Sequence, residues 1–323
     1  VVAGGEQLVI SGMQDITGLR LAEEALRVSE QRFRALVENT GEIIYTVRAE
    51  GDPMSGDIDF VSSSVEDIIG YSPEEFLADP GLWSRIVHPD DMEEVWETTI
   101  ALEQGGGNAT RLYRLRHKAT GEYRWMEDHV TFRPSKLPGA VTLLGAARDV
   151  TQRKQAEEES SLLQSVALAV SEAADLTSGL EAVLKIVCDA TGWSVGEAWT
   201  PSRDGTALEC AAWSVSNEAL DGFIRNSEWM TFAPGVGLPG RVWSSGKPLW
   251  VRDVTGDPNC SRSAYAQEAG LKAGVAVPVL AGDEVVAVMV FFMFEAREED
   301  ERFVSLVSAV AAQLGALVRR KRA

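Results

Sequence analysis

The stretch GAARDVTQRKQAEEESSLLQSVALAVSE, residues Gly145–Glu172, decides how the chain is organised. It begins as the end of a short apolar strand, passes Asp149 and Thr151, and continues with helical periodicity. Asp and Thr side chains accept hydrogen bonds from the free N–H groups at a helix start. Apolar residues then recur at spacings of three, four and seven: Ala156, Leu163, Val166, Val170 and Ala173. This pattern predicts a coiled-coil-like helix, residues 152–173, that connects two modules.

The same pattern occurs near the N-terminus, in GMQDITGLRLAEEALRVSE, residues Gly12–Glu30. Asp15 and Thr17 again stand between a strand end and a helical run, about one domain length before Asp149. We therefore expect residues 1–16 to be the remnant strand of a preceding module and residues 17–32 to be a second connector helix. Asp15 and Thr17, like Asp149 and Thr151, are predicted to join a strand to a helix.

Composition sets the class of protein. A chain of 323 residues predicts two domains, each large enough to bury a core. The net charge of −19 argues against binding to nucleic acid or to an anionic membrane surface, because both require a basic surface. The longest apolar run, Val285–Phe294, is too short to cross a bilayer. We therefore expect no direct membrane insertion. The three cysteines are odd in number and lack metal-ligand spacing, which indicates a reducing, cytoplasmic location.

The first module resembles a PAS domain of the common bacterial sensor type. The residues that carry the resemblance are FRALVENTGEIIYTV from Phe33, SSSVEDIIGYSPEEF from Ser62, WSRIVHPDD from Trp83, YRLRHKATGEYRW from Tyr113, and the closing GAARDVT. The resemblance covers residues 33–151 and implies an α+β fold, an antiparallel sheet flanked by helices. PAS domains share a fold and differ in ligand, so the resemblance leaves the ligand open.

The second module resembles a GAF domain, which is also α+β. The matching stretches are GWSVGEAW from Gly192, FAPGVGLPGRVW from Phe232 and AGLKAGVAVPV from Ala269. The resemblance covers residues 174–322, with a C-terminal signalling helix over about Arg297–Arg319. Such GAF domains precede the catalytic regions of sensor histidine kinases and of cyclic-dinucleotide enzymes.

No constellation of catalytic residues is recognisable, and the phospho-acceptor and ATP-binding motifs of a kinase are missing from these residues. We therefore expect this chain not to be an enzyme itself. GVGLPG, residues 235–240, contains the spacing of a dinucleotide-binding loop. Pro234 interrupts the strand that such a loop needs, and Pro239 removes a backbone donor, so we interpret the motif as a turn followed by a helix.

Candidate ligand sites follow from aromatic residues and one cysteine. The candidate pocket of the PAS module is Trp83, Tyr113 and Trp125. The candidate pocket of the GAF module is Trp199, Trp213, Trp243, Cys260 and Tyr265, although strand alternation explains Trp199 and Trp213 as core residues equally well.

The cofactor is unknown, and the alternatives are no cofactor, a bilin, a haem or a flavin. Cys260 is a candidate attachment site or redox thiol, against the simpler interpretation of a small apolar residue. All three histidines lie in the first module, which excludes histidine-ligated haem in the second. The first module has no cysteine, which excludes a thiol–flavin adduct there and leaves reversible flavin binding open.

Together the resemblances imply the sensory and signal-relay region of a bacterial two-component protein, most simply a sensor histidine kinase. We expect a parallel homodimer joined along Thr17–Leu36, Thr151–Ala173 and Arg297–Arg319, because each helix would otherwise leave an apolar seam in water. The output domain would lie outside this chain. Two alternatives remain: a bilin- or haem-binding photoreceptor or redox sensor that uses Cys260, and a structural dimerisation spacer.

Overall fold

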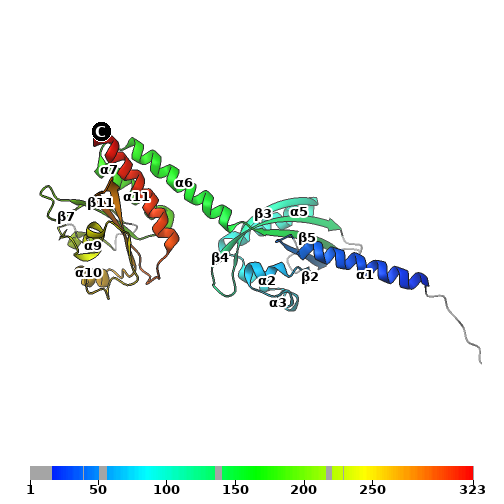
Figure 1. Ribbon diagram of the computed structural model, residues 1–323. Coiled ribbons are helices and arrows are strands. Elements are labelled where there is room, and N and C mark those ends of the chain that lie inside the picture. Colours follow the sequence, from blue (N-terminus) through cyan, green and yellow to red (C-terminus); the bar gives the residue numbers. More distant parts are fainter. Residues whose placement is uncertain are drawn as a thin grey trace, which may run out of the picture. The chain divides into compact units, whose positions relative to one another are not determined.

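The computed structural model describes residues 17–38, 40–50, 57–134, 140–215, 220–227 and 229–322. The chain divides into two compact units, residues 1–155 and 156–323 (Figure 1). The remnant strand expected over residues 1–16, and with it Asp15, lies outside the described residues. Each unit is a mixed helix and sheet structure with an antiparallel sheet, as the sequence predicts.

The first unit is built on a five-stranded sheet in the order β2-β1-β5-β4-β3. Its strands are β1 (Ile43–Glu50), β2 (Asp57–Val61), β3 (Gly107–Arg116), β4 (Tyr123–Pro134) and β5 (Ala140–Asp149). Its helices are α1 (Thr17–Glu38), α2 (Ser64–Ile69), α3 (Pro73–Ala78), α4 (Leu82–Ile86) and α5 (Met92–Gly105), with a 3-10 turn over Pro89–Asp91. The hairpin expected around Gly121 forms between β3 and β4, with Gly121 in the left-handed conformation that glycine favours.

The core of the first unit lies on one face of this sheet. Side chains alternate along a strand, so every second residue of β3 and β4 faces the helices. Tyr113 and Leu115 of β3 and Met126 and Val130 of β4 are buried there. Helices α2, α3, α4 and α5 cover this face with apolar residues such as Ile69. An antiparallel sheet flanked by helices is the arrangement that the resemblance implies, and the structure adds that these helices cover one face.

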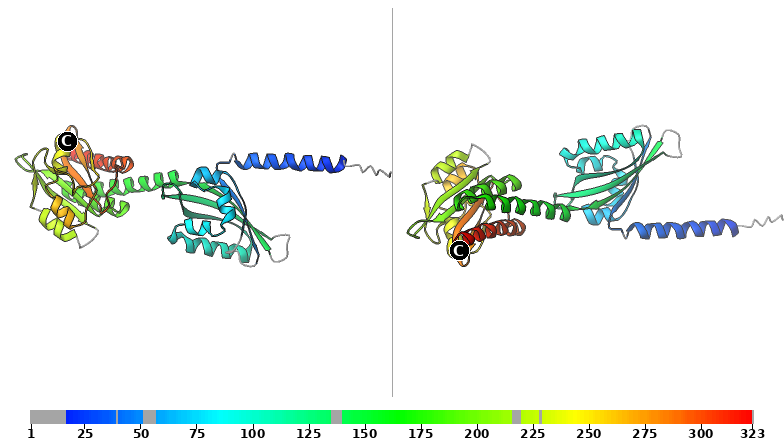
Figure 2. Two further views of the ribbon diagram at one scale, coloured as in Figure 1. Left: turned by 90° about the horizontal axis from the view of Figure 1, so that it is seen from below. Right: turned by 90° about the horizontal axis from the view of Figure 1, so that it is seen from above.

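The second unit, coloured from green to red in Figure 2, is built on one sheet. This sheet has six strands in the order β8-β7-β6-β11-β10-β9. Its strands are β6 (Val195–Pro201), β7 (Leu208–Val215), β8 (Thr231–Phe232), β9 (Leu249–Val251), β10 (Gly274–Ala281) and β11 (Glu284–Phe292). Its helices are α6 (Thr151–Glu172), which begins in the first unit, α7 (Leu176–Thr191), α8 (Asp221–Ser227), α9 (Gly237–Ser245), α10 (Ser263–Glu268) and α11 (Glu301–Arg322).

Both faces of the second sheet are buried, and β11 shows why. Ala287, Met289 and Phe291 face one core, which contains residues of α6, α7 and α11. Val288 and Val290 alternate with them and face a second core, which contains residues of α8, α9 and α10. A strand buried on both faces is apolar throughout, which is the reason for the long apolar run in this part of the sequence.

Helix α11 begins at Glu301 rather than near Arg297. The carboxylate of Asp300 accepts a hydrogen bond from the backbone amide of Phe303 at 3.0 Å, which fixes the helix start. Among the described residues, α11 is the one helix whose length and composition would suit a bilayer. Its apolar side chains, for example Val307 and Leu314, are instead buried, and the helix packs against β10 and α7. The helix is therefore a core element of the second unit.

This packing corrects the premise of the expected homodimer. Val166 and Val170 of α6 are buried in the core of their own unit, and so are the stripe residues of α11. These seams are covered within one chain, because α6, α7 and α11 pack together on the sheet. Leu26 of α1 and Leu168 of α6 do remain exposed.

Candidate functional site

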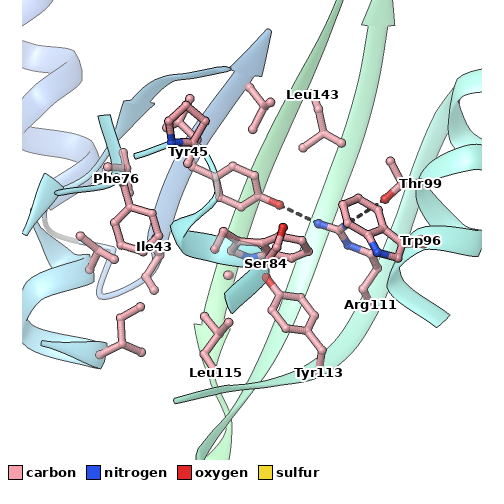
Figure 3. A pocket seen from close by; sticks show the side chains of 18 residues that line it. Ile43, Tyr45, Phe76, Ser84, Trp96, Thr99, Arg111, Tyr113, Leu115 and Leu143 are labelled. Atoms are coloured by element: carbon pink, nitrogen blue, oxygen red, sulfur yellow. Dashed lines mark hydrogen bonds between the residues drawn. The ribbon is translucent and has the colours of Figure 1, made fainter. Parts of the chain in front are cut away.

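The first unit contains a cavity of about 110 Å³ between its sheet and helices α2 to α5. Most of its wall is aliphatic, for example Ile69, Leu115 and Ala147 (Figure 3). Five aromatic residues complete the apolar wall: Tyr45, Phe76, Trp83, Trp96 and Tyr113. The cavity therefore has the mainly apolar lining with a few polar groups that is typical of small-molecule sites.

Trp83 is the centre of the aromatic wall. Its ring centroid lies 5.8 Å from that of Trp96 and 5.8 Å from that of Tyr113, both in edge-to-face geometry. This arrangement is favourable for aromatic quadrupoles and fixes the orientation of the rings. Because the three rings come from α4, α5 and β3, they tie both helices to the sheet at the cavity.

One wall of the cavity is polar and charged. Arg111 of β3 lines the cavity, and its Nη2 lies 2.5 Å from Oδ2 of Asp128 on β4. The hydroxyls of Tyr45 and Tyr113 donate to the same Oδ2, at 2.8 Å and 3.1 Å. Arg111 also donates from Nη2 to the Tyr45 hydroxyl at 2.8 Å and from Nη1 to Thr99 at 3.0 Å (Figure 3). Arg111 is 6% exposed and Asp128 is 0% exposed. The two charges compensate each other inside the core.

Burial determines the protonation of this cluster. Burial raises the pKa of Tyr45 and of Tyr113 well above the ordinary value, and the Asp128 carboxylate raises both further. Burial lowers the pKa of Arg111, but Tyr45 and Asp128 raise that pKa by more. The two phenols therefore remain hydrogen-bond donors and the guanidinium remains charged.

Two buried atoms of this cluster have no hydrogen-bond partner within the described part of the chain, Arg111 Nε and Asp128 Oδ1. Leaving a buried donor or acceptor unsatisfied costs about 1–3 kcal/mol, and more for a charged group. Such atoms in a folded protein accompany strain, a catalytic role or a bound water or ion. They show that the chain itself leaves part of this buried cluster behind the cavity wall unsatisfied.

Gly145 makes room for this arrangement. It lies opposite Tyr45 in the pairing of β5 with β1, and a Cβ atom at Gly145 would stand 2.1 Å from the Tyr45 ring. The absence of a side chain lets the ring lie across β5 and reach Asp128. A glycine in the stretch that organises the chain therefore has a specific role in the cavity.

Sequence reasoning placed Trp83, Tyr113 and Trp125 in this pocket. The structure places Trp83 and Tyr113 in the cavity wall and Trp125 outside it. Met126, the neighbour of Trp125 on β4, faces the core, so Trp125 faces the opposite side of the sheet. There the cations of Arg114 and Lys154 lie 5.0 Å and 5.5 Å from the Trp125 ring centroid.

Trp125 belongs instead to the junction between β5 and α6. Asp149 accepts a hydrogen bond from the backbone amide of Thr151 at 2.8 Å and one from Arg124 at 3.1 Å. The hydroxyl of Thr151 accepts from the backbone amide of Trp125 at 2.9 Å. The Asp-x-Thr motif thus ties the end of β5 and the start of α6 to β4. At the corresponding N-terminal motif, α1 begins at Thr17, whose side chain lies outside the described part of the structure.

In the second unit, the aromatic residues surround an internal ion pair. Arg262 makes two hydrogen bonds to Glu197, at 2.7 Å and 2.8 Å, and both residues are buried. Trp199 donates from Nε1 to Glu197 at 3.0 Å. The Arg262 guanidinium lies 4.9–5.4 Å from the ring centroids of Trp199, Phe223, Phe232 and Phe292. The side chain of Arg262 therefore occupies the space inside this aromatic cage.

The other expected GAF pocket residues lie apart from the cage centre. Trp213 is 45% exposed on β7 and Tyr265 is 38% exposed on α10. Trp243 and Cys260 are partly buried against the core that contains Trp199. Burial raises the pKa of the Cys260 thiol, which disfavours the reactive thiolate. Trp199 is thus the only one of the five in the cage.

The GVGLPG motif forms a turn followed by helix α9, as interpreted from the sequence. The side chain of Asn259 bridges the turn: it accepts from the amide of Gly237 and donates to the carbonyl of Gly235, both at 3.0 Å. A Cβ atom at Gly240 would stand 2.3 Å from the carbonyl oxygen of Ala233. The glycines allow a close backbone approach within the chain itself.

Sequence reasoning missed Arg111, Asp128, Glu197 and Arg262. The sequence did contain a signal for the pair of Arg111 and Asp128. Arg111 shares its strand face with Tyr113 and Leu115, and Asp128 shares its strand face with Met126 and Val130. A charged residue at a core-facing position of a strand needs a partner. Among the described residues, no group of three or more His, Cys, Asp or Glu side chains could hold a metal ion.

Comparison with known proteins agrees with the fold of the two units. Residues 58–147 match the family model of the PAS fold, and residues 173–319 match that of the GAF domain. The chain is 27% identical over 325 residues to a methyl sulfide methyltransferase-associated sensor of Methanosarcina acetivorans. That match covers 96% of this chain and 31% of that protein, so the chain spans about a third of this relative.

Two further similarities are weaker. Over 156 residues, the chain is 27% identical to the uncharacterized protein y4lL of Sinorhizobium fredii, covering 47% of this chain and 17% of that protein. It also aligns with the solved GAF domain of A. aeolicus nlh2 at 19% identity and a TM-score of 0.42, covering 51% of this chain and 97% of that one. The two family models show that the chain contains a PAS domain followed by a GAF domain, and these two sensory domains support a role in sensing a signal.

Proposed function

We propose that this chain is the ligand-sensing and relay region of a larger cytoplasmic signal-transduction protein, most simply a sensor histidine kinase. The observation that carries the proposal is the PAS cavity with its buried polar wall. The chain performs no chemistry in this proposal, and its output domain belongs to the remainder of the protein. The GAF domain, whose aromatic cage holds the side chain of Arg262, serves as the relay.

The relay begins at the cavity. Leu143 and Ala147 of β5 line it, and Asp149, two residues further along the same strand, accepts the amide of Thr151 at the start of α6. A ligand that displaces β5 therefore also displaces the first turn of α6. Trp125 adds a second connection, because its ring contacts both Arg114 of β3 and Lys154 of α6. A ligand drives such a change only by its difference in affinity for the two states.

We also propose a parallel homodimer in which α1 and α6 of two copies pack together. Leu21 and Leu26 of α1 and Leu168 of α6 are exposed apolar residues that support this arrangement. Helix α11 takes no part in this dimer, because its apolar stripe is buried within its own unit. Sedimentation at micromolar concentration is the test: a dimer is expected, and a monomer would contradict it.

A thermal-shift screen of small molecules tests the sensing role. A ligand that binds only the folded chain raises its melting temperature. Ala147→Leu places a larger side chain in the cavity and is expected to abolish the shift. Ala146→Leu, on the opposite face of β5, is the matched control and should keep it. Dimethyl sulfide belongs in the screen, since the relative from Methanosarcina acetivorans is named for a methyl sulfide methyltransferase.

Two outcomes would contradict this proposal. The first is a screen in which no compound raises the melting temperature in a way that Ala147→Leu abolishes. The second concerns the relay: Asp149→Ala in the full-length protein is expected to weaken the coupling of ligand to output, and unchanged coupling would exclude that role.

The chromophore alternative has its own test, since a visible absorption band that survives acid denaturation would indicate covalent attachment at Cys260.

A further inference from the structure

We propose that the PAS cavity binds a small, uncharged and mostly apolar organic molecule that carries one hydrogen-bond acceptor, such as a carbonyl oxygen. This inference rests on the proposed sensing role and specifies its ligand class. Three properties of the cavity carry it: its volume, the composition of its wall and the charge balance of its polar side.

Volume limits the ligand first. The cavity measures about 110 Å³. An engineered apolar cavity of ~150 Å³ accommodates a benzene molecule. The PAS cavity therefore suits a molecule of benzene size or smaller, and it is far too small for a flavin, a haem or a bilin.

The wall sets the polarity. Apart from Arg111 and the hydroxyls of Tyr45, Ser84, Thr99 and Tyr113, the cavity is lined by apolar side chains. Transfer of apolar surface into such a site is favourable by about 25 cal/mol per Å². A ligand with a hydrocarbon body thus gains most of its binding free energy from the wall and little from polar contacts.

Charge balance excludes ions. The guanidinium of Arg111 already has its counter-ion, because Asp128 Oδ2 lies 2.5 Å from Nη2. A second anion would lie near the Asp128 carboxylate, and the described lining residues offer no further cation to pair with it. A cationic ligand would meet Arg111 across the cavity. In either case an uncompensated charge would be buried, which is strongly unfavourable.

The open hydrogen-bonding position selects the polar group. Arg111 Nη2 donates to the Tyr45 hydroxyl and to Asp128, whereas Nη1, which carries two N–H groups, has one acceptor among the described residues, Thr99. The second N–H group of Nη1 is complemented by a single acceptor atom. A carbonyl oxygen meets this requirement without bringing a charge or a further donor that needs its own partner.

The test uses three probes of equal heavy-atom count: 2-butanone, propionate and n-butylammonium. Binding is followed by NMR, from the indole N–H signals of Trp83 and Trp96 in the intact chain. We expect saturable shifts with 2-butanone and binding of the two ions weaker by at least about tenfold. Ala147→Leu should abolish the response to 2-butanone, and Ala146→Leu should preserve it.

The outcomes separate the two proposals. If propionate or n-butylammonium binds as tightly as 2-butanone, with the same dependence on Ala147, the charge argument is wrong and the sensing role stands. If riboflavin binds and Ala147→Leu abolishes its binding, the size argument is wrong and the sensing role again stands. If no compound in this set or in the wider screen binds with dependence on Ala147, both the ligand class and the sensing role are wrong.

Discussion

The backbone amide of Trp125 donates a hydrogen bond to the hydroxyl of Thr151 at 2.9 Å, which joins strand β4 to the first residue of helix α6. Val150, the residue directly before the helix, strengthens this link, because its backbone amide donates to the carbonyl of Trp125 at 2.8 Å. The start of α6 is therefore held by the sheet that lines the cavity. Any movement of β4 or β5 reaches the helix through short hydrogen bonds.

Thr151→Val tests this link. Valine has nearly the shape of threonine but no acceptor, so the Trp125 amide would lose its partner. We expect the first unit to lose about 1 kcal/mol of stability in chemical denaturation, because the amide is only partly buried and the net contribution of a hydrogen bond is about 0.5–1.5 kcal/mol. Thr151→Ser keeps the acceptor and should stay close to the parent. Equal stabilities of the valine and serine variants would show that the hydrogen bond contributes nothing.

Asp128→Leu tests the buried charge pair of the cavity. The variant leaves the guanidinium of Arg111 without a counter-ion, and removing one partner of a buried pair costs about 3–5 kcal/mol. The double variant Arg111→Met/Asp128→Leu removes both charges and should recover most of that loss. Urea denaturation of the single and double variants measures the difference. A double variant as unstable as the single one would contradict the assigned pairing.

Gly145→Ala tests the close approach of Tyr45. The added Cβ would lie 2.1 Å from the ring, so the ring must move and its hydroxyl loses Asp128. We expect a loss of about 1–3 kcal/mol in stability, as for overpacking of a core. The double variant Tyr45→Ala/Gly145→Ala has no clash, so its loss of stability should be smaller than the sum of the losses of the two single variants. A loss equal to that sum would show that the Tyr45 ring does not lie against Gly145.

Arg262→Ala tests the GAF cage. It leaves the carboxylate of Glu197 buried without its guanidinium, and a loss of about 3–5 kcal/mol is expected. Millimolar methylguanidinium should restore part of the melting temperature by entering the vacated cage, whereas methylammonium should restore less because it lacks the two-pronged geometry. Equal effects of the two ions would show that the cage has no preference for a guanidinium.

The pH dependence of stability tests Asp91. Hydrogen bonds from Arg114 hold the pKa of Asp91 below its ordinary value near 3.8, despite partial burial. A lowered pKa in the folded state gives stability that is present above the unfolded pKa and is lost as the pH falls through the folded one. Asp91→Asn should therefore lower stability at neutral pH and reduce the loss below about pH 4. An unchanged acid profile would contradict this assignment.

Thiol reactivity tests burial in the second unit. Burial raises the pKa of Cys188 to about 12, so its thiol stays protonated at pH 8. We expect iodoacetamide to modify Cys188 at pH 8 only after denaturation, as followed by mass spectrometry. Rapid labelling of Cys188 in the native chain would contradict the packing of α7 against the sheet.

The periodicity of the sequence determined most of the architecture. Alternation of apolar residues predicts the strands, the Asp-x-Thr motif predicts where α6 begins, and the turn at Gly121 predicts the β3–β4 hairpin. The register of that hairpin places Arg111 directly opposite Asp128. The pair was thus accessible by counting residues from the turn, since hairpin register is a local property.

The tertiary structure decided what these elements face. Tyr45 reaches Asp128 across 83 residues of sequence, and Arg262 reaches Glu197 across 65. Such contacts depend on non-local strand pairing and helix packing, which periodicity does not specify. The same reason explains α11: its heptad-like stripe fits a partner helix and a sheet equally well, and only the position of β10 shows that the sheet covers it. Local sequence therefore determined the elements, and the packing of distant segments determined the cavity.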